Sequence, residues 1–196
     1  MSLYLAIEGV DGAGKSTVCR ELATALAAEG KTVRVVREPG GTAVGEQIRQ
    51  ILLHGEEMTP WTEALLFAAQ RAQLAAEVIA PALEQGEVVI SDRSYYSSLA
   101  YQGGARGLGI DAVRTVNELA LGGVIPDLVV VLWTDPETAL ARQNVIDRIG
   151  GEGARFQREV AAVYQQVAAE NPDRVVLVDA SRPVGEVVEE ILELIR

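Results

Sequence analysis

Residues 9–17 form a glycine-rich segment that ends in a lysine and two hydroxyl residues, Gly-Val-Asp-Gly-Ala-Gly-Lys-Ser-Thr. The segment fits the phosphate-binding pattern G-x-x-x-x-G-K-[ST], with Gly9, Gly14, Lys15 and Ser16 at the fixed positions. Glycines let backbone N–H groups turn toward a phosphate, and a helix that follows adds its unpaired N–H groups. The lysine supplies a mobile positive charge, and the serine hydroxyl can ligate Mg²⁺. The pattern therefore predicts a nucleotide site.

The neighbours of this segment give the pattern the setting that it requires. Residues 3–7 are an apolar run typical of a buried strand, and residues 17–29 repeat apolar side chains at helical spacing, at Val18, Leu22 and Leu26. A strand, a glycine loop and a helix in this order favour phosphate binding over the alternative, a glycine-rich turn without a ligand.

The rest of the chain alternates between short apolar runs and longer helical patterns. We predict strands at 3–7, 32–36, 87–91, 128–133 and 174–178, and helices at 17–29, 43–53, 62–83, 111–121, 137–145, 156–169 and 184–195. The helix over 62–83 is expected to be interrupted near Pro81. This alternation predicts a single α/β domain over residues 1–196, with a five-stranded parallel sheet and helices on both faces. Ligands of such sheets bind at the carboxyl ends of the strands, where Glu38, Asp92, Arg93 and Asp135 fall.

Composition and charge exclude several classes of protein. A net charge of −11 argues against a nucleic-acid partner, which would require a basic face. No apolar run approaches the length of a membrane span, so we expect a cytoplasmic protein without a membrane partner. The single cysteine, Cys19, excludes an internal disulfide, and we expect it to be a packed side chain rather than a reactive thiol. The single histidine, His54, argues against a histidine metal site or a Ser-His-Asp triad.

Three further segments resemble one enzyme family. They are residues 37–42 (Arg-Glu-Pro-Gly-Gly-Thr), residues 66–71 (Leu-Phe-Ala-Ala-Gln-Arg) and residues 90–102 (Ile-Ser-Asp-Arg-Ser-Tyr-Tyr-Ser-Ser-Leu-Ala-Tyr-Gln). Together with the phosphate loop they resemble thymidylate kinase of the bacterial type, over essentially the whole chain. The resemblance implies the P-loop nucleoside monophosphate kinase fold, transfer of phosphate from ATP to dTMP with Mg²⁺, and a homodimer.

The resemblance also implies roles for the ATP side of the site. The residues expected to bind ATP are Gly9, Val10, Asp11, Gly12, Ala13, Gly14, Lys15, Ser16, Thr17 and Arg142, the last by stacking on adenine. The expected catalytic residues are Lys15, Asp92, Arg93 and Arg148, and the expected metal residues are Ser16, Glu38 and Asp92.

The resemblance assigns a second set of residues to dTMP. They are Asp11, Glu38, Arg49, Phe67, Arg71, Arg93, Ser97, Ser98, Tyr101 and Gln102. In the family, the counterparts of Arg93 and Arg49 bind the acceptor phosphate, and that of Asp11 accepts from the 3′-hydroxyl. The counterpart of Phe67 stacks on the pyrimidine, that of Arg71 donates to its O4, and that of Tyr101 packs under the deoxyribose. Ser97, Ser98 and Gln102 are expected to reach the base edge.

Most of these residues have a structural alternative. Asp92 and Arg93 could form a strand-end salt bridge, Arg49 could lie on a solvated helix face, and Glu38 could stabilise a turn. Without the resemblance, Phe67 would be interpreted as a core residue.

Family members place the transition-state arginine either in the phosphate loop or in a lid. The loop position is Gly12 here, so we expect a mobile lid over about residues 142–155 to supply Arg148, against the alternative of a solvated basic face. The chain departs from the family pattern at Ser94 and at Gly150-Gly151.

Two other functions stay open. One is a kinase with another pyrimidine acceptor, and the other is a non-catalytic ATP-binding module. A GTP switch is excluded, because its Asn-Lys-x-Asp motif needs a lysine beyond Lys15 and Lys31, the only two in the chain.

Overall fold

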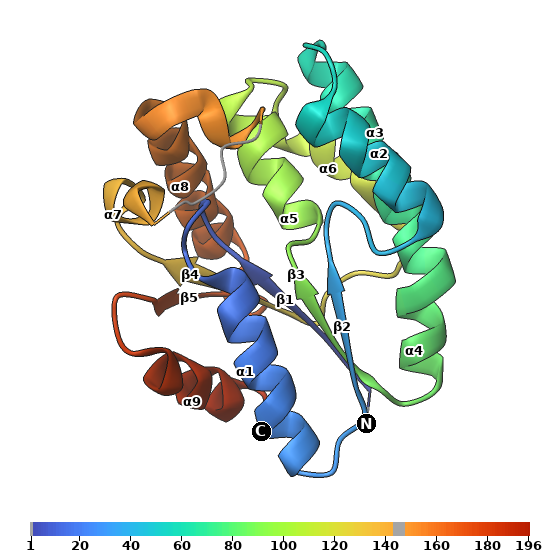
Figure 1. Cartoon of the computed structure of the whole chain (residues 1–196), viewed down its shortest axis with the longest axis vertical. Helices are drawn as coiled ribbons and strands as arrows, with labels where there is room; N and C mark the ends of the chain where they lie inside the picture. Colours follow the sequence, from blue (N-terminus) through green and yellow to red (C-terminus); the bar gives the residue numbers. More distant parts are fainter. Residues whose placement is uncertain (1, 143–147) are drawn as a thin grey trace.

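A computed structural model describes residues 2–142 and 148–196. Five parallel strands form one sheet in the order β2-β3-β1-β4-β5 (Figure 1). The strands are β1 (Leu3–Glu8), β2 (Val33–Arg37), β3 (Val88–Asp92), β4 (Leu128–Trp133) and β5 (Val175–Asp179). The predicted α/β fold with a five-stranded parallel sheet is confirmed, and four of the strands begin or end one residue away from the predicted bounds.

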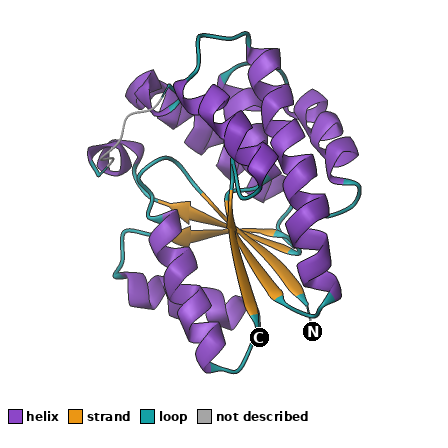
Figure 2. Ribbon diagram, turned by 45° about the vertical axis from the view of Figure 1, so that its right-hand side comes forward, coloured by secondary structure: helices purple, strands orange, loops and turns teal. Residues whose placement is uncertain are grey.

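The central strands are buried on both faces. Every residue of β1 after Leu3 is buried, and the interior of β4 is a run of buried valine and leucine. Continuous apolar strands of this kind require a helical layer on each side, and helices do lie on both sides of the sheet (Figure 2). β2, at one edge, is largely exposed.

Helices cover the sheet and surround its carboxyl edge. The α-helices are α1 (Lys15–Ala28), α2 (Ala43–His54), α3 (Pro60–Leu74), α4 (Ala80–Glu84), α5 (Tyr95–Ser98), α6 (Ile110–Leu121), α7 (Pro136–Ala141), α8 (Gly153–Glu170) and α9 (Val184–Leu194). The wide helical turns η1 (Ala75–Ile79) and η2 (Leu99–Ala105) are of the π type, and η3 (Gly150–Glu152) is a 3₁₀ turn. No helix within 2–142 and 148–196 has both the length and the apolar character of a membrane span.

The predicted break near Pro81 is confirmed as a change of helical type. The N–H of Ala80 donates to the carbonyl of Ala75, a five-residue spacing, and α4 then begins with Pro81 in its first turn. Proline lacks the N–H that a continuous α-helix needs, so a wider turn before it keeps the chain helical.

The sequence analysis missed the helical segment after β3. Ser94 caps α5 by accepting from the N–H of Tyr96, and η2 continues the turn to Ala105. This short segment carries the motif Ser97 to Gln102, so the fold presents the motif on one helical turn beside the sheet.

The strand register brings the phosphate loop and the Asp92-Arg93 pair together. Ile7 of β1 lies beside Asp92 of β3, which in turn lies beside Arg37 of β2. The loop after β1 and the turn after β3 therefore leave the sheet side by side, at the edge where parallel α/β sheets bind ligands.

Candidate active site

A cavity of about 330 Å³ opens at this edge of the sheet. The predicted site residues that line it are Asp11, Gly12, Lys15, Ser16, Glu38, Arg49, Phe67, Asp92, Arg93, Ser97, Ser98, Tyr101 and Gln102. Arg37, Pro39, Leu53 and Ile149 complete the wall. One cavity thus joins residues expected on the ATP side with residues expected on the dTMP side.

The phosphate loop closes around the Lys15 ammonium group. Gly9, Gly12 and Gly14 have positive φ angles of 138°, 82° and 92°, which glycine adopts without a Cβ penalty. Lys15 Nζ donates to the carbonyls of Gly9 at 3.2 Å and Val10 at 2.8 Å. Burial disfavours the charged ammonium and, with the positive charge of Arg93 nearby, lowers the pKa of Lys15 to about 8. Two loop carbonyls therefore fix the position of the Lys15 ammonium group.

Ser16 and Asp92, two of the three residues predicted to hold a metal, lie in direct contact, whereas the side chain of the third, Glu38, pairs with Arg71 instead. Ser16 Oγ donates to Asp92 Oδ2 at 2.5 Å. Within the described part of the chain, no cluster of three or more His, Cys, Asp and Glu side chains could form a metal cage. Mg²⁺ bound with nucleotides needs only one or two protein oxygens, because phosphates and water complete its shell, so this pair fits the ion.

Arg93, the residue that follows β3, has a strained backbone conformation. Its φ of 75° is the one positive value among the described non-glycine residues. Its N–H donates to the carbonyl of Ile7 at 3.0 Å, and its carbonyl accepts from Ser91 Oγ at 2.5 Å. These bonds hold the backbone in the left-handed region, which costs a non-glycine residue about 1–3 kcal/mol.

The Arg93 guanidinium spans both halves of the cavity. It donates to Ser97 Oγ at 3.0 Å and to the carbonyl of Gly9 at 3.3 Å, pairs with Asp11, and lies 5.1 Å from the centre of the Tyr101 ring. The predicted alternative, a salt bridge with Asp92, is not what the structure shows, because the partner of Arg93 is Asp11.

Gln157 of α8 contacts Asp11 and was missed by the sequence analysis. Its amide nitrogen donates to Asp11 Oδ2 at 3.1 Å, and its amide oxygen accepts from the N–H of Asp11 at 3.4 Å. Burial alone would raise the pKa of Asp11, but the charges of Arg93 and Lys15 outweigh it and lower that pKa. Asp11 is therefore a fixed, ionised acceptor inside the phosphate loop.

Phe67 lines the cavity, and Arg71 lies behind it on the same helix. Arg71 is only 1% exposed and its guanidinium lies 5.8 Å from the centre of the Phe67 ring. It pairs with Glu38 and donates to Ser98 Oγ at 3.0 Å and to Asn117 Oδ1 at 2.6 Å. The structure therefore ties Arg71 to protein groups and does not place it on the cavity wall.

Glu38 faces the cavity with one oxygen unsatisfied. Oε2 accepts from Arg71, whereas Oε1 is buried and has no hydrogen-bond partner among the described residues. Burial raises the pKa of Glu38, and the Arg71 charge opposes that rise. A buried acceptor without a donor favours a ligand role over a purely turn-stabilising one.

The remaining acceptor-side residues are held by neighbours from several elements. Arg49 Nη1 donates to the carbonyl of Pro39 at 2.8 Å. Gln102 Nε2 donates to the buried carboxylate of Glu63 at 2.8 Å. Tyr101 packs edge-on against Phe156 with ring centres 5.9 Å apart.

The two arginines predicted in the lid lie outside the cavity wall. Arg142 ends α7 and is exposed. Arg148 Nε donates to the carbonyl of Leu52 at 2.9 Å, and its Nη2 lies 2.8 Å from Glu63 Oε2. The structure does not bring Arg148 to the phosphate loop, so its transition-state role stays a prediction. Residues 143–147, in the first half of the predicted lid, fall outside the described residues.

Comparisons with known proteins agree on one family. Residues 7–191 match the family model described as thymidylate kinase. A thymidylate kinase of Synechococcus sp. (strain JA-3-3Ab) is 44% identical over 99% of this chain and 95% of its own length. Those of Lactobacillus delbrueckii subsp. bulgaricus and Bacillus pumilus are 45% and 41% identical, over 98% and 99% of this chain and 95% of their own lengths. The chain therefore belongs to the thymidylate kinase family.

Proposed function

We propose that this protein transfers the γ-phosphoryl group of ATP to dTMP, forming dTDP and ADP. The observation that carries the proposal is the single cavity in which the phosphate loop, Arg93, Tyr101 and Phe67 meet. Family membership supports the same reaction, since the relatives are named for thymidylate. A phosphoryl transfer needs two anionic substrates close together, and the cavity offers cations to both.

The chain's own residues contribute mainly by position and charge. The loop N–H groups and Lys15 bind the donor phosphates, and Arg93 binds the acceptor phosphate through its planar guanidinium. Ser16 and Asp92 would hold Mg²⁺, which neutralises phosphate charge when bound. Asp11 accepts from the sugar hydroxyl, and Tyr101 packs under the sugar. No covalent intermediate with the enzyme is required.

The groups expected to contact the base predict an order of preference among acceptor nucleotides. Thymine and uracil differ by one methyl group, so dUMP should lose about 1–3 kcal/mol of transition-state binding relative to dTMP. Cytosine presents a donor where thymine presents O4. Arg71 is buried behind Phe67 and bonded to Glu38, Ser98 and Asn117, so it can oppose this donor only if it turns toward the base when the acceptor binds; in that case dCMP should be rejected more strongly than dUMP.

A coupled ADP-release assay with dTMP, dUMP, dCMP, UMP and no acceptor tests the proposal. We expect turnover to be fastest with dTMP, and Lys15→Ala or Arg93→Ala to lower kcat/KM by about a hundredfold or more with the fold retained. Faster turnover of another pyrimidine would assign a different acceptor. ATP binding without ADP release would indicate a non-catalytic module.

We also propose a cytoplasmic homodimer. A cytoplasmic location follows from the need for ATP as co-substrate. Exposed apolar side chains on three adjacent helices support the dimer, namely Val44 and Ile51 of α2, Trp61 and Leu65 of α3, and Leu119 of α6. Burying such side chains between two copies is the common way to form a stable homodimer.

A further inference from the structure

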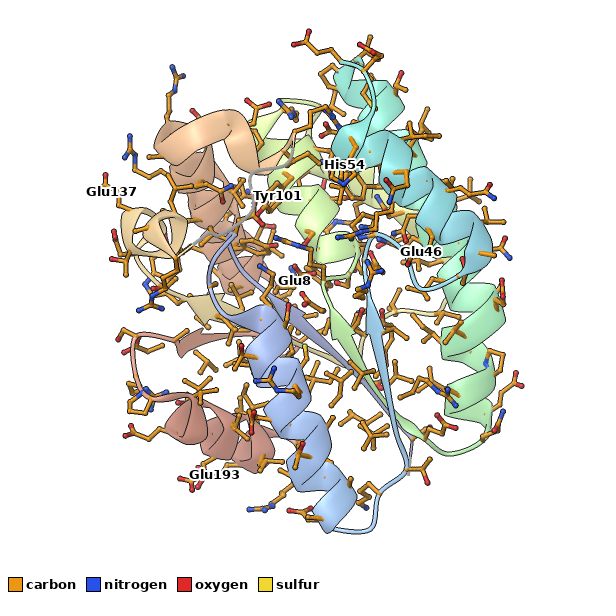
Figure 3. All side chains as sticks on the ribbon, in the orientation of Figure 1. Glu8, Glu46, His54, Tyr101, Glu137 and Glu193 are labelled. Carbon is orange, nitrogen blue, oxygen red and sulfur yellow. The ribbon has the colours of Figure 1, made fainter. Side chains whose placement is uncertain are left out.

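Glu8 is a fully buried carboxylate directly behind the phosphate loop. It is the last residue of β1, precedes Gly9 and has no exposed surface. Figure 3 labels Glu8 near the carboxyl edge of the sheet, with Tyr101 above it. None of the ion pairs within residues 2–142 and 148–196 involves Glu8. A buried carboxylate needs hydrogen-bond donors, so the identity of its donors indicates what it does.

The donors to Glu8 come from the turn after β3 and from α8. Oε1 accepts from the N–H of Ser94 at 2.7 Å, Ser94 Oγ at 2.7 Å and the N–H of Ser97 at 3.2 Å. Oε2 accepts from Ser97 Oγ at 2.6 Å and from the Tyr164 hydroxyl at 2.7 Å. Ser94 and Ser97 flank the start of α5, so Glu8 holds this helix against the end of β1.

These bonds also fix the direction of the Ser97 hydroxyl. Each hydroxyl has one proton, and both Ser97 Oγ and the Tyr164 hydroxyl donate to Oε2, so neither proton serves the 3.1 Å contact between these two oxygens. The lone pairs of Ser97 Oγ are then available to Arg93 Nη1, 3.0 Å away. The protons run in one direction, from Arg93 to Ser97 to Glu8. A buried, fully satisfied chain of this kind has one arrangement and resists rotation of its members.

We infer that Glu8 is a positioning residue that orients the Arg93 guanidinium through the Ser97 hydroxyl, and so sets the affinity of the site for the acceptor phosphate. The inference rests on the proposed function for the identity of that acceptor. Glu8 touches neither substrate in this assignment. Arg93 has other partners in Asp11 and the carbonyl of Gly9, so loss of the Glu8 contact shifts the guanidinium without releasing it.

Glu8→Gln tests this role with little change of shape. Two of the three donors at Oε1 are backbone N–H groups that cannot reverse, so the amide oxygen must stay on that side. The amide NH₂ then faces Ser97 Oγ and donates to it, so the Ser97 proton must turn away from residue 8 and the lone pair that accepts from Arg93 is redirected. We expect the KM for dTMP to rise about tenfold, with the KM for ATP changed by less than about twofold. Glu87→Gln is the matched control, because Glu87 is also a buried glutamate of the sheet region but pairs with Arg34, outside the cavity.

We call the chain of hydrogen bonds from Arg93 through Ser97 to Glu8 the relay. The variant Ser97→Ala, alone and combined with Glu8→Gln, separates an effect of the relay from a general loss of structure. If Glu8 acts through Ser97, Glu8→Gln adds little further loss to Ser97→Ala, whereas independent roles would multiply. Ser97→Ala keeps the test available if Glu8→Gln does not fold, because an unchanged KM for dTMP in that variant also contradicts the relay.

The outcomes distinguish the relay from the proposed function. Equal KM values for dTMP in wild type and Glu8→Gln, or equal rises for dTMP and ATP, would overturn the relay while leaving the reaction intact. If wild type forms no ADP with dTMP, the proposed function fails, and crystal structures of the ligand-free wild type and Glu8→Gln decide the relay alone. A displaced Arg93 guanidinium in the variant supports it, and an unmoved one refutes it.

Discussion

Burial disfavours the positive charge of Lys15 when no phosphate is bound beside it. Its ammonium group is buried against two loop carbonyls and close to Arg93, and its pKa falls to about 8 from an ordinary value of 10.5. Phosphate oxygens beside Lys15 would raise its pKa again, because an anion favours the charged form of the lysine. Nucleotide binding is therefore coupled to protonation of Lys15.

The first prediction concerns pH and ATP. Above about pH 8 the free enzyme must take up a proton on Lys15 to bind the phosphates, so ATP affinity should fall as pH rises from 8 toward 10. Calorimetric titration of ATP across this range measures the effect. Lys15→Met, which carries no titrating group, should bind ATP weakly with a flatter pH profile. Equal slopes for the two proteins would contradict the assignment.

The same shift predicts a change in stability without ligand. A depressed lysine pKa means that the folded state binds fewer protons than the unfolded chain between about pH 8 and 10.5, so the contribution of Lys15 to the free energy of unfolding rises with pH in that window. Urea denaturation at pH 7.5 and about 9.5 gives the free energies of unfolding of wild type and Lys15→Met. The wild-type value minus the Lys15→Met value should be larger at the higher pH. A difference that stays constant or falls would show that Lys15 is not held as described.

At the residue scale, the sequence predicted which residues of local motifs gather at one site. The phosphate loop, Arg93 and Tyr101 belong to continuous motifs, and the cavity contains all of them. Glu8 and Gln157 were missed because a glutamate ending a strand, or a glutamine on a helix, carries no local signal. Their partners lie 86 and 146 residues away along the chain, so only the fold identifies them.

At the scale of elements, α7 approaches the phosphate loop closely enough to exclude a side chain at position 12. A Cβ on Gly12 would overlap the carbonyl group of Ala139, which belongs to α7. This contact gives a physical reason for a glycine where some relatives are expected to carry an arginine. The sequence predicted the glycine loop and the helix that corresponds to α7. It did not predict their contact, because the distance between two elements depends on packing throughout the fold.

The third prediction compares two glycines with similar backbone angles. Gly12 and Gly86 have φ values of 82° and 77°, but a Cβ on Gly86 meets no atom within 4 Å. Alanine at either position pays the left-handed penalty of about 1–2 kcal/mol. Only Gly12→Ala also pushes the loop and α7 apart, so its KM for ATP should rise about tenfold or more while that of Gly86→Ala stays near wild type. Thermal melts and ATP titrations of both variants check this. Equal ATP affinities would refute the contact.

The helical segments show why element boundaries were only partly predicted. The sequence predicted a helix over 62–83 interrupted near Pro81, and the structure has α3, the wide turn η1 and α4 in succession. Sequence signalled the proline but not the change of hydrogen-bond spacing. The segment from Tyr95 to Ala105 carries serines and glycines with poor helix propensity, and it is helical because Glu8, α6 and α8 pack around it.

On the scale of the whole molecule, the cations that line the cavity and the exposed apolar side chains of α2, α3 and α6 occupy different positions. The chain carries a net charge of −11, yet Lys15, Arg37, Arg49 and Arg93 converge on one cavity. A local cluster of cations in an acidic protein favours small anions over long polyanions, which would meet repulsion outside the cavity. The exposed apolar side chains of α2, α3 and α6 are at positions other than those that line the cavity.

The fourth prediction tests whether these helices form a dimer interface. Leu119 of α6 is 85% exposed and Leu65 of α3 is 53% exposed, which is unfavourable for two leucines on adjacent helices unless a partner covers them. We expect wild type to sediment as a dimer, and Leu65→Glu or Leu119→Glu to shift it toward monomer, because a carboxylate would be buried against an apolar partner surface. Leu194→Glu on α9, where the leucine is 43% exposed, is the matched control and should leave the dimer intact. Analytical ultracentrifugation at several protein concentrations distinguishes these states. A monomeric wild type, or a control that dissociates as readily as the α3 and α6 variants, would exclude this face as the interface.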